Sequence, residues 1–292
     1  MTVGVRFQNF VAALMLTSDQ ALDGSTKQYG VRGCLDAHYW GNSNANYGFL
    51  IGSWGKSTEI RPPRDVDVMF QLPSSVYERF QTRPGNKQSQ LLQEVKEVLK
   101  KTYSNTEMRA DGQVVVVPFA SYAVEVAPAF LLQDGKYWIC DTNNGGRYKT
   151  TDPKAEIKHV KDSNDLTNGN TRALIRMIKC WQGYCNVPLK SFLIELLAVE
   201  FLSTWTYKDK GTTFYDWMVR DFFLFLKNKE SWSSVYVPGT GEVLYLGDSG
   251  WKSRAETAYD RAVKATNHES NNEPYSAGAE WQKIFGTDIP TG

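Results

Sequence analysis

Three acidic residues lie beside apolar residues in the sequence, and their spacing suits the binding of divalent metal ions. Asp65 and Asp67 are separated by one residue and run into the apolar residues 68–70, and Glu125 lies inside the apolar stretch 123–127. Alternate side chains of a β-strand project from one face, roughly 6.5–7 Å apart, so both aspartates are expected to point the same way. With a glutamate from a neighbouring strand they could hold two ions about 3.5–4 Å apart, which suits an in-line phosphoryl displacement. Ligation by oxygen alone selects Mg²⁺ or Mn²⁺.

The sequence alone also allows these acidic residues a purely structural role. An isolated Asp-x-Asp pattern is common in solvated turns and in edge strands. Glu125 could form a buried salt bridge with Arg64 or with another cation instead of binding a metal ion. Because an unpaired carboxylate is costly to bury, the apolar surroundings of Glu125 require one of these two partners.

The pair Gly52-Ser53 precedes the aspartates and could receive a triphosphate. Glycine permits a close approach of the backbone to a ligand, and Ser53 offers a hydroxyl and a backbone N–H at an expected helix or turn N-terminus, where phosphate oxygens bind well. Residues 55–58, Gly-Lys-Ser-Thr, look like the end of a P-loop. That motif needs a glycine five residues before its Gly-Lys pair, and position 50 is Leu, so the pattern disfavours a P-loop.

The combination of these residues resembles the bacterial CD-NTases, which are relatives of cyclic GMP–AMP synthase and oligoadenylate synthase in the polymerase-β-like superfamily. The resemblance covers most of residues 30–200. It departs from the family pattern at Glu125, where many members have Asp, and at Ser57, where Gly is frequent. The residues that carry the resemblance are Gly52, Ser53, Thr58, residues 65–67, residues 124–130, Trp138, residues 151–153, Lys179, Trp181, residues 190–192 and Glu195.

The resemblance implies catalytic and nucleotide-binding roles for particular side chains. The catalytic residues and metal ligands would be Asp65, Asp67 and Glu125, and the glutamate would also activate the attacking ribose hydroxyl. The residues expected to bind the donor nucleotide are Gly52, Ser53, Lys179, Ser191 and Phe192.

Two of these nucleotide-binding residues have a structural explanation as well. Phe192 could stack on a base, but its helical spacing with Leu189 and Leu196 also fits a residue of the core. Lys179 follows two apolar residues on an expected helix, and it could be a surface lysine whose stem covers apolar neighbours.

The activity implied by the resemblance is the synthesis of a small signalling nucleotide. A nucleotidyltransferase of this kind would join nucleoside triphosphates, ATP or GTP or both, into a cyclic di- or trinucleotide and release pyrophosphate. Two Mg²⁺ or Mn²⁺ ions would serve as cofactors. The product would activate a downstream effector in bacterial antiphage (CBASS) signalling. Two rivals stay open: a transferase that adds a nucleotide to an RNA, antibiotic or protein acceptor, and a catalytically silent module that binds a nucleotide or a partner.

The strands and helices expected around these residues indicate an α+β fold. The resemblance implies a polymerase-β-like nucleotidyltransferase core, a mixed twisted sheet with flanking helices, at residues 1–163, and a helical C-terminal lobe at residues 164–292. Hydrophobic periodicity and turn signals predict the elements themselves. Strands are expected at 65–72, 113–119 and 121–130, and residues 47–51 are expected to form a buried strand or a helix end. Helices are expected within 5–45 and at 87–103, 171–182, 189–205 and 214–227.

Composition excludes several other classes of protein. Lys and Arg number 33 against 32 for Asp and Glu, which disfavours activation by long nucleic acid, since such binders need surplus cations. The four cysteines and three histidines show no zinc-ligand spacing. Polar residues interrupt the apolar residues near Phe10, and the apolar ones fall on one face of an expected helix. This pattern predicts neither a signal peptide nor a membrane span. We therefore expect a cytoplasmic protein, and the resemblance implies a bacterial one.

Overall fold

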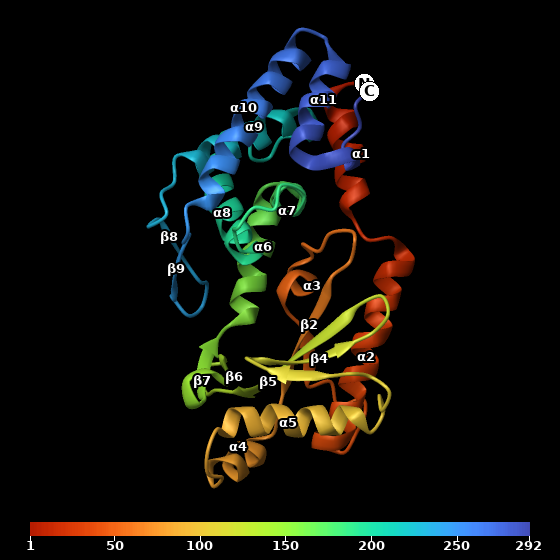
Figure 1. Cartoon of the computed structure of the whole chain (residues 1–292), viewed down its shortest axis with the longest axis vertical. Helices are drawn as coiled ribbons and strands as arrows, with labels where there is room; N and C mark the ends of the chain where they lie inside the picture. Colours follow the sequence, from red (N-terminus) through yellow and green to blue (C-terminus); the bar gives the residue numbers. More distant parts are fainter. The chain divides into compact units, whose positions relative to one another are not determined.

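The computed structural model describes residues 1–292, the side chain of Asp111 excepted, and the chain forms two compact units (Figure 1). Unit 1 contains Met1–Met15, Thr58–Pro62 and Lys158–Gly292, and unit 2 contains Leu16–Ser57 and Pro63–Ile157. The prediction from the sequence divides the chain once, into residues 1–163 and 164–292. The contacts instead group the chain into interleaved segments, because it passes between the units after residues 15, 57, 62 and 157.

Unit 2 is built on a seven-stranded mixed sheet with the order β1-β2-β5-β4-β3, in which β6 also pairs with β5 and β7 pairs with β6. Strands β2 and β5 run parallel, and the other pairs are antiparallel. The expected mixed sheet is therefore confirmed. The strands are β1 (Gly48–Leu50), β2 (Asp65–Gln71), β3 (Arg109–Asp111), β4 (Val114–Pro118), β5 (Ala123–Leu131), β6 (Tyr137–Asp141) and β7 (Arg147–Thr151).

Most helices of unit 2 cover one face of this sheet. The helices are α2 (Ser18–Trp40), α3 (Gly52–Lys56), α4 (Ser74–Gln81) and α5 (Lys87–Lys100). A capping box between Thr17 and Gln20 begins α2, and it satisfies backbone N–H groups that would otherwise lack partners. Apolar residues of α2 and α5 share one buried core with the strands, among them Val31, Leu35, Leu91, Leu92, Val95, Val124 and Val126.

The alternation of side chains along β2 gives the strand two different faces. Val66, Val68 and Phe70 are fully buried in the core that contains α2 and α5. Asp65 and Asp67 point to the opposite face, where Asp65 is exposed and Asp67 is half-buried. The period of two that predicted this strand from the sequence also separates its core side from its polar side.

Unit 1 is helical except for one small hairpin. Helix α6 (Pro153–Leu166) begins in unit 2 and continues into unit 1. The other elements of unit 1 are α1 (Val3–Leu14), α7 (Asn170–Tyr184), α8 (Ser191–Thr204), α9 (Tyr215–Lys227), α10 (Gly250–Ser270), α11 (Pro274–Phe285) and the strands β8 (Ser234–Tyr236) and β9 (Val243–Tyr245). Short 3₁₀ turns lie at Asn143–Gly145, Thr212–Phe214 and Gly286–Asp288.

The two ends of the chain are joined within unit 1, where Figure 1 shows them side by side. Arg6 of α1 is fully buried and donates to Glu269 Oε1 at 3.0 Å. It also donates to the carbonyls of Pro274 at 2.6 Å and Thr291 at 3.0 Å. A buried guanidinium needs such partners, so these contacts fix α1 against the last two helices.

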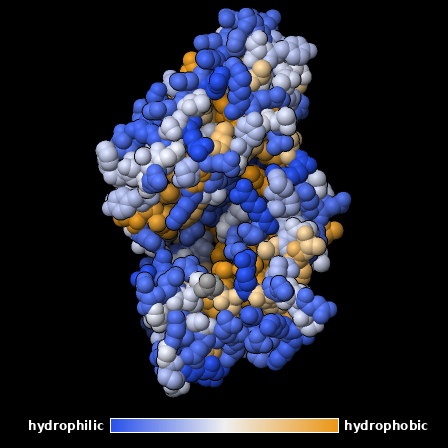
Figure 2. Space-filling model, viewed as in Figure 1, coloured by the Kyte–Doolittle hydropathy of each residue, from blue (hydrophilic) through white to orange (hydrophobic). Residues whose placement is uncertain are grey.

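The surface seen in Figure 2 is mostly hydrophilic, and its apolar residues gather in separate patches. Among the described residues, no helix is both long enough and apolar enough to cross a membrane. The predicted α+β class, with helices around a central sheet and a helical C-terminal portion, is confirmed.

Candidate active site

The three acids predicted from the sequence lie on one face of two adjacent strands. In the parallel pairing of β2 with β5, Asp67 lies opposite Glu125 and Asp65 lies opposite Ala123. Paired residues of neighbouring strands project from the same face, and Asp65 shares that face with Asp67 because it precedes it by two. We call these three residues the acidic face.

The acidic face gathers three carboxylates on one side of the sheet. Among the described residues, the side chains of Asp65 and Glu125 make no hydrogen bond and no ion pair, and Arg64 makes no ion pair with Glu125. The open alternative of an Arg64 salt bridge is therefore not formed. Burial, and next the negative charge of Asp65, raise the pKa of Glu125, because both disfavour the ionised carboxylate.

A cation that sequence reasoning missed lies on the same face, two strands away. Arg109 of β3 lies opposite Val116 of β4, and Val116 lies opposite Glu125. The guanidinium of Arg109 opposes the other two influences and lowers the pKa of Glu125. No local pattern marks Arg109 in the sequence, since its place depends on the pairing of three strands.

Gly52 lies directly against the carboxylate of Asp67. The backbone of Gly52 is left-handed, with φ +56°, and a Cβ at this position would lie 1.9 Å from Asp67 Oδ2. The N–H of Ile51 donates to the Asp67 carbonyl at 3.0 Å, which attaches the start of α3 to β2. Only glycine fits here without a clash, and Ser53, half-buried, follows it as the second residue of α3.

The donor set of the acidic face fits a hard divalent cation. Two carboxylates without protein partners, beside a third on the same face, provide oxygen ligands and a charge that needs compensation. As the side chains stand, no three His, Cys, Asp or Glu residues among those described are arranged to hold a metal ion. Binding would therefore require the three carboxylates to turn about their side-chain bonds.

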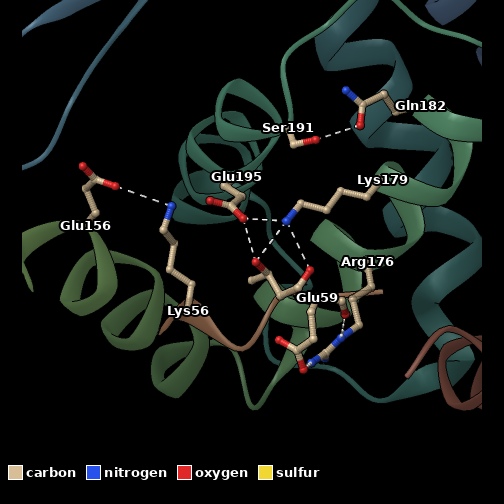
Figure 3. A network of polar contacts seen from close by, with 9 residues as sticks. Lys56, Glu59, Glu156, Arg176, Lys179, Gln182, Ser191 and Glu195 are labelled. Carbon is tan, nitrogen blue, oxygen red and sulfur yellow. Dashed lines mark hydrogen bonds and ion pairs between the residues drawn. The ribbon is translucent and has the colours of Figure 1, made fainter. Parts of the chain in front are cut away.

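Lys179, an expected triphosphate ligand, is buried in unit 1 with protein partners. Its Nζ donates to Glu195 Oε1 at 2.6 Å, to Thr58 Oγ1 at 3.1 Å and to the Thr58 carbonyl at 3.2 Å (Figure 3). The alternative of a surface lysine is wrong, because the Lys179 side chain is only 8% exposed. Its role toward a triphosphate stays a prediction.

The remaining expected nucleotide-binding residues begin helix α8. Ser191 is its first residue, and its hydroxyl donates to Gln182 Oε1 at 3.0 Å (Figure 3). Phe192 is partly buried and packs against the helical core, as the structural alternative from its spacing proposed. Base stacking by Phe192 stays a prediction.

Comparisons with known proteins point to one family. The family model described as "Second Messenger Oligonucleotide or Dinucleotide Synthetase domain" matches residues 1–164. A Bacillus cereus (strain VD146) protein named "Probable cyclic nucleotide synthase" is 23% identical over 82% of this chain and 81% of its own length.

Two further relatives agree with this result. The "CBASS oligonucleotide cyclase CdnC" of Escherichia coli (strain KTE188) is 29% identical over 52% of this chain, which spans about half (49%) of that relative's length. The structure of E. coli MS115-1 CdnC with ATP superposes with a TM-score of 0.69 at 18% identity, over 98% of both chains, and this likeness concerns the fold.

Proposed function

Since the chain belongs to the family of Second Messenger Oligonucleotide or Dinucleotide Synthetase domains, we propose that it joins nucleoside triphosphates into a cyclic di- or trinucleotide and releases pyrophosphate. The enzyme is a nucleotidyltransferase, as its named relatives are cyclic nucleotide synthases and oligonucleotide cyclases. The observation that carries the proposal is the acidic face, in which Asp67 and Glu125 are register partners and Asp65 shares their side of the sheet.

The proposed reaction forms one bond and breaks one bond at the α-phosphorus of the donor. A ribose hydroxyl oxygen of the acceptor nucleotide bonds to the α-phosphorus, the bond from that phosphorus to the oxygen bridging to the β-phosphate breaks, and pyrophosphate leaves. Glu125, which lies beside Asp67 on the acidic face, accepts the hydroxyl proton as a general base. A second round within the linear product closes the ring.

Two Mg²⁺ or Mn²⁺ ions, when bound to the acidic face, would neutralise phosphate charge and stabilise the attacking and leaving oxygens. Asp65, Asp67 and Glu125 are the proposed ligands. Gly52 leaves room beside Asp67, where a larger residue would displace the carboxylate. Placing these groups before the reaction begins lowers the barrier through orientation.

Donor binding is assigned to Gly52, Ser53, Lys179, Ser191 and Phe192. Ser53 and Ser191 present hydroxyls that can donate to triphosphate oxygens, and Phe192 presents a ring that can stack on a base. ATP, GTP or both are the proposed substrates, and the bacterial cytoplasm, which supplies them, is the proposed location. The product would act on an effector in antiphage signalling.

The direct test incubates the purified chain with labelled nucleoside triphosphates, alone and in every pairing, with Mg²⁺ or Mn²⁺ and no acceptor. A phosphatase then removes unreacted and linear phosphate ends. A resistant product, identified by mass spectrometry as a cyclic nucleotide, supports the proposal. Product that forms only with an added RNA, antibiotic or protein would support the acceptor transferase, and nucleotide binding without any product would support the silent module.

A further inference from the structure

The segment Thr58–Pro62 joins the two elements that carry the proposed catalytic residues. It leaves α3, which holds Ser53, and it leads into β2, which holds Asp65 and Asp67. Both of these elements belong to unit 2, but the segment itself groups with unit 1. We call it the tether, because unit 1 holds the chain between the two catalytic elements.

Helix α7 anchors the first two residues of the tether. Lys179 donates to the hydroxyl of Thr58 at 3.1 Å and to its carbonyl at 3.2 Å. Arg176, one turn earlier on the helix, donates from Nε to the carbonyl of Glu59 at 3.1 Å, and its Nη2 lies 3.6 Å from Glu59 Oε1 (Figure 3). Two cations of one helix therefore hold consecutive peptide groups.

Helix α1 anchors the other end of the tether. The N–H of Arg61 donates to the Leu14 carbonyl at 2.8 Å, and its guanidinium donates from Nε to the Ala13 carbonyl at 2.9 Å. These carbonyls lie at the C-terminal end of α1, where such groups lack helical partners and cations bind favourably.

Glu195 of α8 completes the strongest of these anchors. Its Oε1 accepts from Lys179 and from the Thr58 hydroxyl, each at 2.6 Å. Thr58 is fully buried and the Glu195 side chain is 3% exposed. A buried charge pair persists only where further hydrogen bonds complete it, and the Thr58 hydroxyl and carbonyl provide them here.

The same contacts bear on what Lys179 can do for a nucleotide. An ammonium group has three N–H donors, and Lys179 makes three hydrogen bonds, to one carboxylate and to two oxygens of Thr58. A triphosphate could bind this group only by displacing some of them.

We propose that Lys179 and Glu195 are positioning residues, which act on catalysis through Thr58 by fixing where the chain passes from Ser53 to Asp65. This inference rests on the proposed function for its effect on turnover. Its effect on the tether itself does not depend on turnover, so the two can fail separately.

The test compares Glu195→Gln and Thr58→Val with the unchanged chain. Glutamine keeps the size of the side chain and removes its charge, and valine keeps the β-branch and removes the bridging hydroxyl. If the pair positions the tether, backbone amides of residues 57–61 exchange hydrogen about tenfold faster in both variants, the factor expected for one lost charge-assisted hydrogen bond. The kcat falls on the order of tenfold to a hundredfold, and the Kd for a non-hydrolysable ATP analogue changes less than about twofold.

The matched control is Glu269→Gln, which removes a buried carboxylate from another ion pair of unit 1, the pair with Arg6. Its thermal stability should fall, while its kcat and the amide exchange of residues 57–61 stay as in the unchanged chain. A weaker Kd for the analogue in the Thr58 and Glu195 variants, with unchanged exchange and kcat, would overturn the positioning role. Faster exchange in a chain that makes no nucleotide product would uphold the tether and contradict the proposed function alone.

Discussion

The acidic face of unit 2 and the Lys179–Glu195 pair of unit 1 differ in whether their carboxylates form an ion pair within the protein. On the acidic face, carboxylates gather on one side of the sheet, and Asp65 and Glu125 have no hydrogen-bond partner among the described residues. In unit 1, the buried carboxylate of Glu195 is matched by the ammonium group of Lys179 at 2.6 Å. The acidic face is therefore suited to bind a cation that the protein does not supply. The Lys179–Glu195 pair already contains its own cation.

The largest effect is expected where the acidic face is neutralised. Asp65→Asn together with Asp67→Asn removes two charges that the proposed ions require, so product formation should fall on the order of a thousandfold or more, since the metal supplies several kcal/mol of stabilisation. Conversion of labelled triphosphates measures this.

The control for that variant is Asp134→Asn, which neutralises an exposed turn aspartate of the same unit, paired with Lys136. It should keep full activity. Unchanged turnover in the double variant would contradict the assignment of Asp65 and Asp67.

A smaller loss is expected when the space beside the acidic face is filled. Gly52→Ala forces a non-glycine residue to adopt φ +56° and places a Cβ 1.9 Å from Asp67 Oδ2, so the carboxylate must move. Because catalytic groups tolerate displacements of less than about 1 Å, kcat should fall on the order of a hundredfold. Steady-state kinetics measures the change.

The control Gly135→Ala distinguishes the effect of a Cβ clash with Asp67 from the effect of backbone strain. Gly135 also has a left-handed backbone, with φ +85°, but a Cβ there meets nothing within 4 Å. This variant should lose about 1–2 kcal/mol of stability and keep its kcat. Equal kcat losses in both variants would show that backbone strain, and not the position of Asp67, limits turnover.

The comparison of the acidic face with the Lys179–Glu195 pair also predicts that neutralising a glutamate changes the free energy of unfolding in opposite directions at the two places. Glu195→Gln leaves a buried ammonium without its counter-charge and should lower the free energy of unfolding by about 3–5 kcal/mol. Glu125→Gln relieves burial of a charge beside Asp65, so without divalent ions it should leave stability unchanged or raise it by up to about 1 kcal/mol.

Urea unfolding of both variants without added metal checks these signs. The Glu125 variant should combine full stability with a loss of product formation. A large destabilisation by Glu125→Gln would mean that Glu125 has a structural partner and that the comparison is wrong.

A pH-dependent effect on stability is expected at a buried acid of unit 1 that forms no ion pair among the described residues. Asp216 in α9 is 4% exposed, and its Oδ1 has no hydrogen-bond partner among the described residues. Burial raises its pKa from 3.8 to about 6. The folded state therefore binds this proton more tightly than the unfolded state, so stability is highest below about pH 4 and falls as the pH rises to about 6.

Asp216→Asn should remove that part of the pH dependence. At pH 7 the variant should be more stable than the unchanged chain by about 2–3 kcal/mol, and near pH 4 the two should match. Chemical unfolding at both pH values measures the difference, and an equal pH slope in both proteins would contradict the burial of Asp216 without an ion pair.

Local patterns in the sequence were sufficient for the elements of the acidic face. The alternation of residues 65–70 predicts β2 and the direction of both aspartates, and the apolar stretch around Glu125 predicts β5. These features depend on neighbours in the chain, which is why periodicity finds them.

Contacts between residues far apart in the sequence could not be predicted from such local patterns. The sequence places α1 with the core, whereas the burial of Arg6 by the last two helices places it in unit 1. The pairing of Lys179 with Glu195 and Thr58 depends on how α7 and α8 pack, and the influence of Arg109 depends on strand order. No spacing rule connects residues that only the folded chain brings together.

The most direct test of the central claim counts divalent ions on the acidic face. Mn²⁺ binding, followed by electron paramagnetic resonance in the presence of a non-hydrolysable triphosphate, should show two ions per chain, the number that suits in-line transfer. Asp65→Asn with Asp67→Asn should abolish this binding, and Glu125→Gln should weaken it. Equal Mn²⁺ binding by the unchanged chain and the double variant would contradict the account.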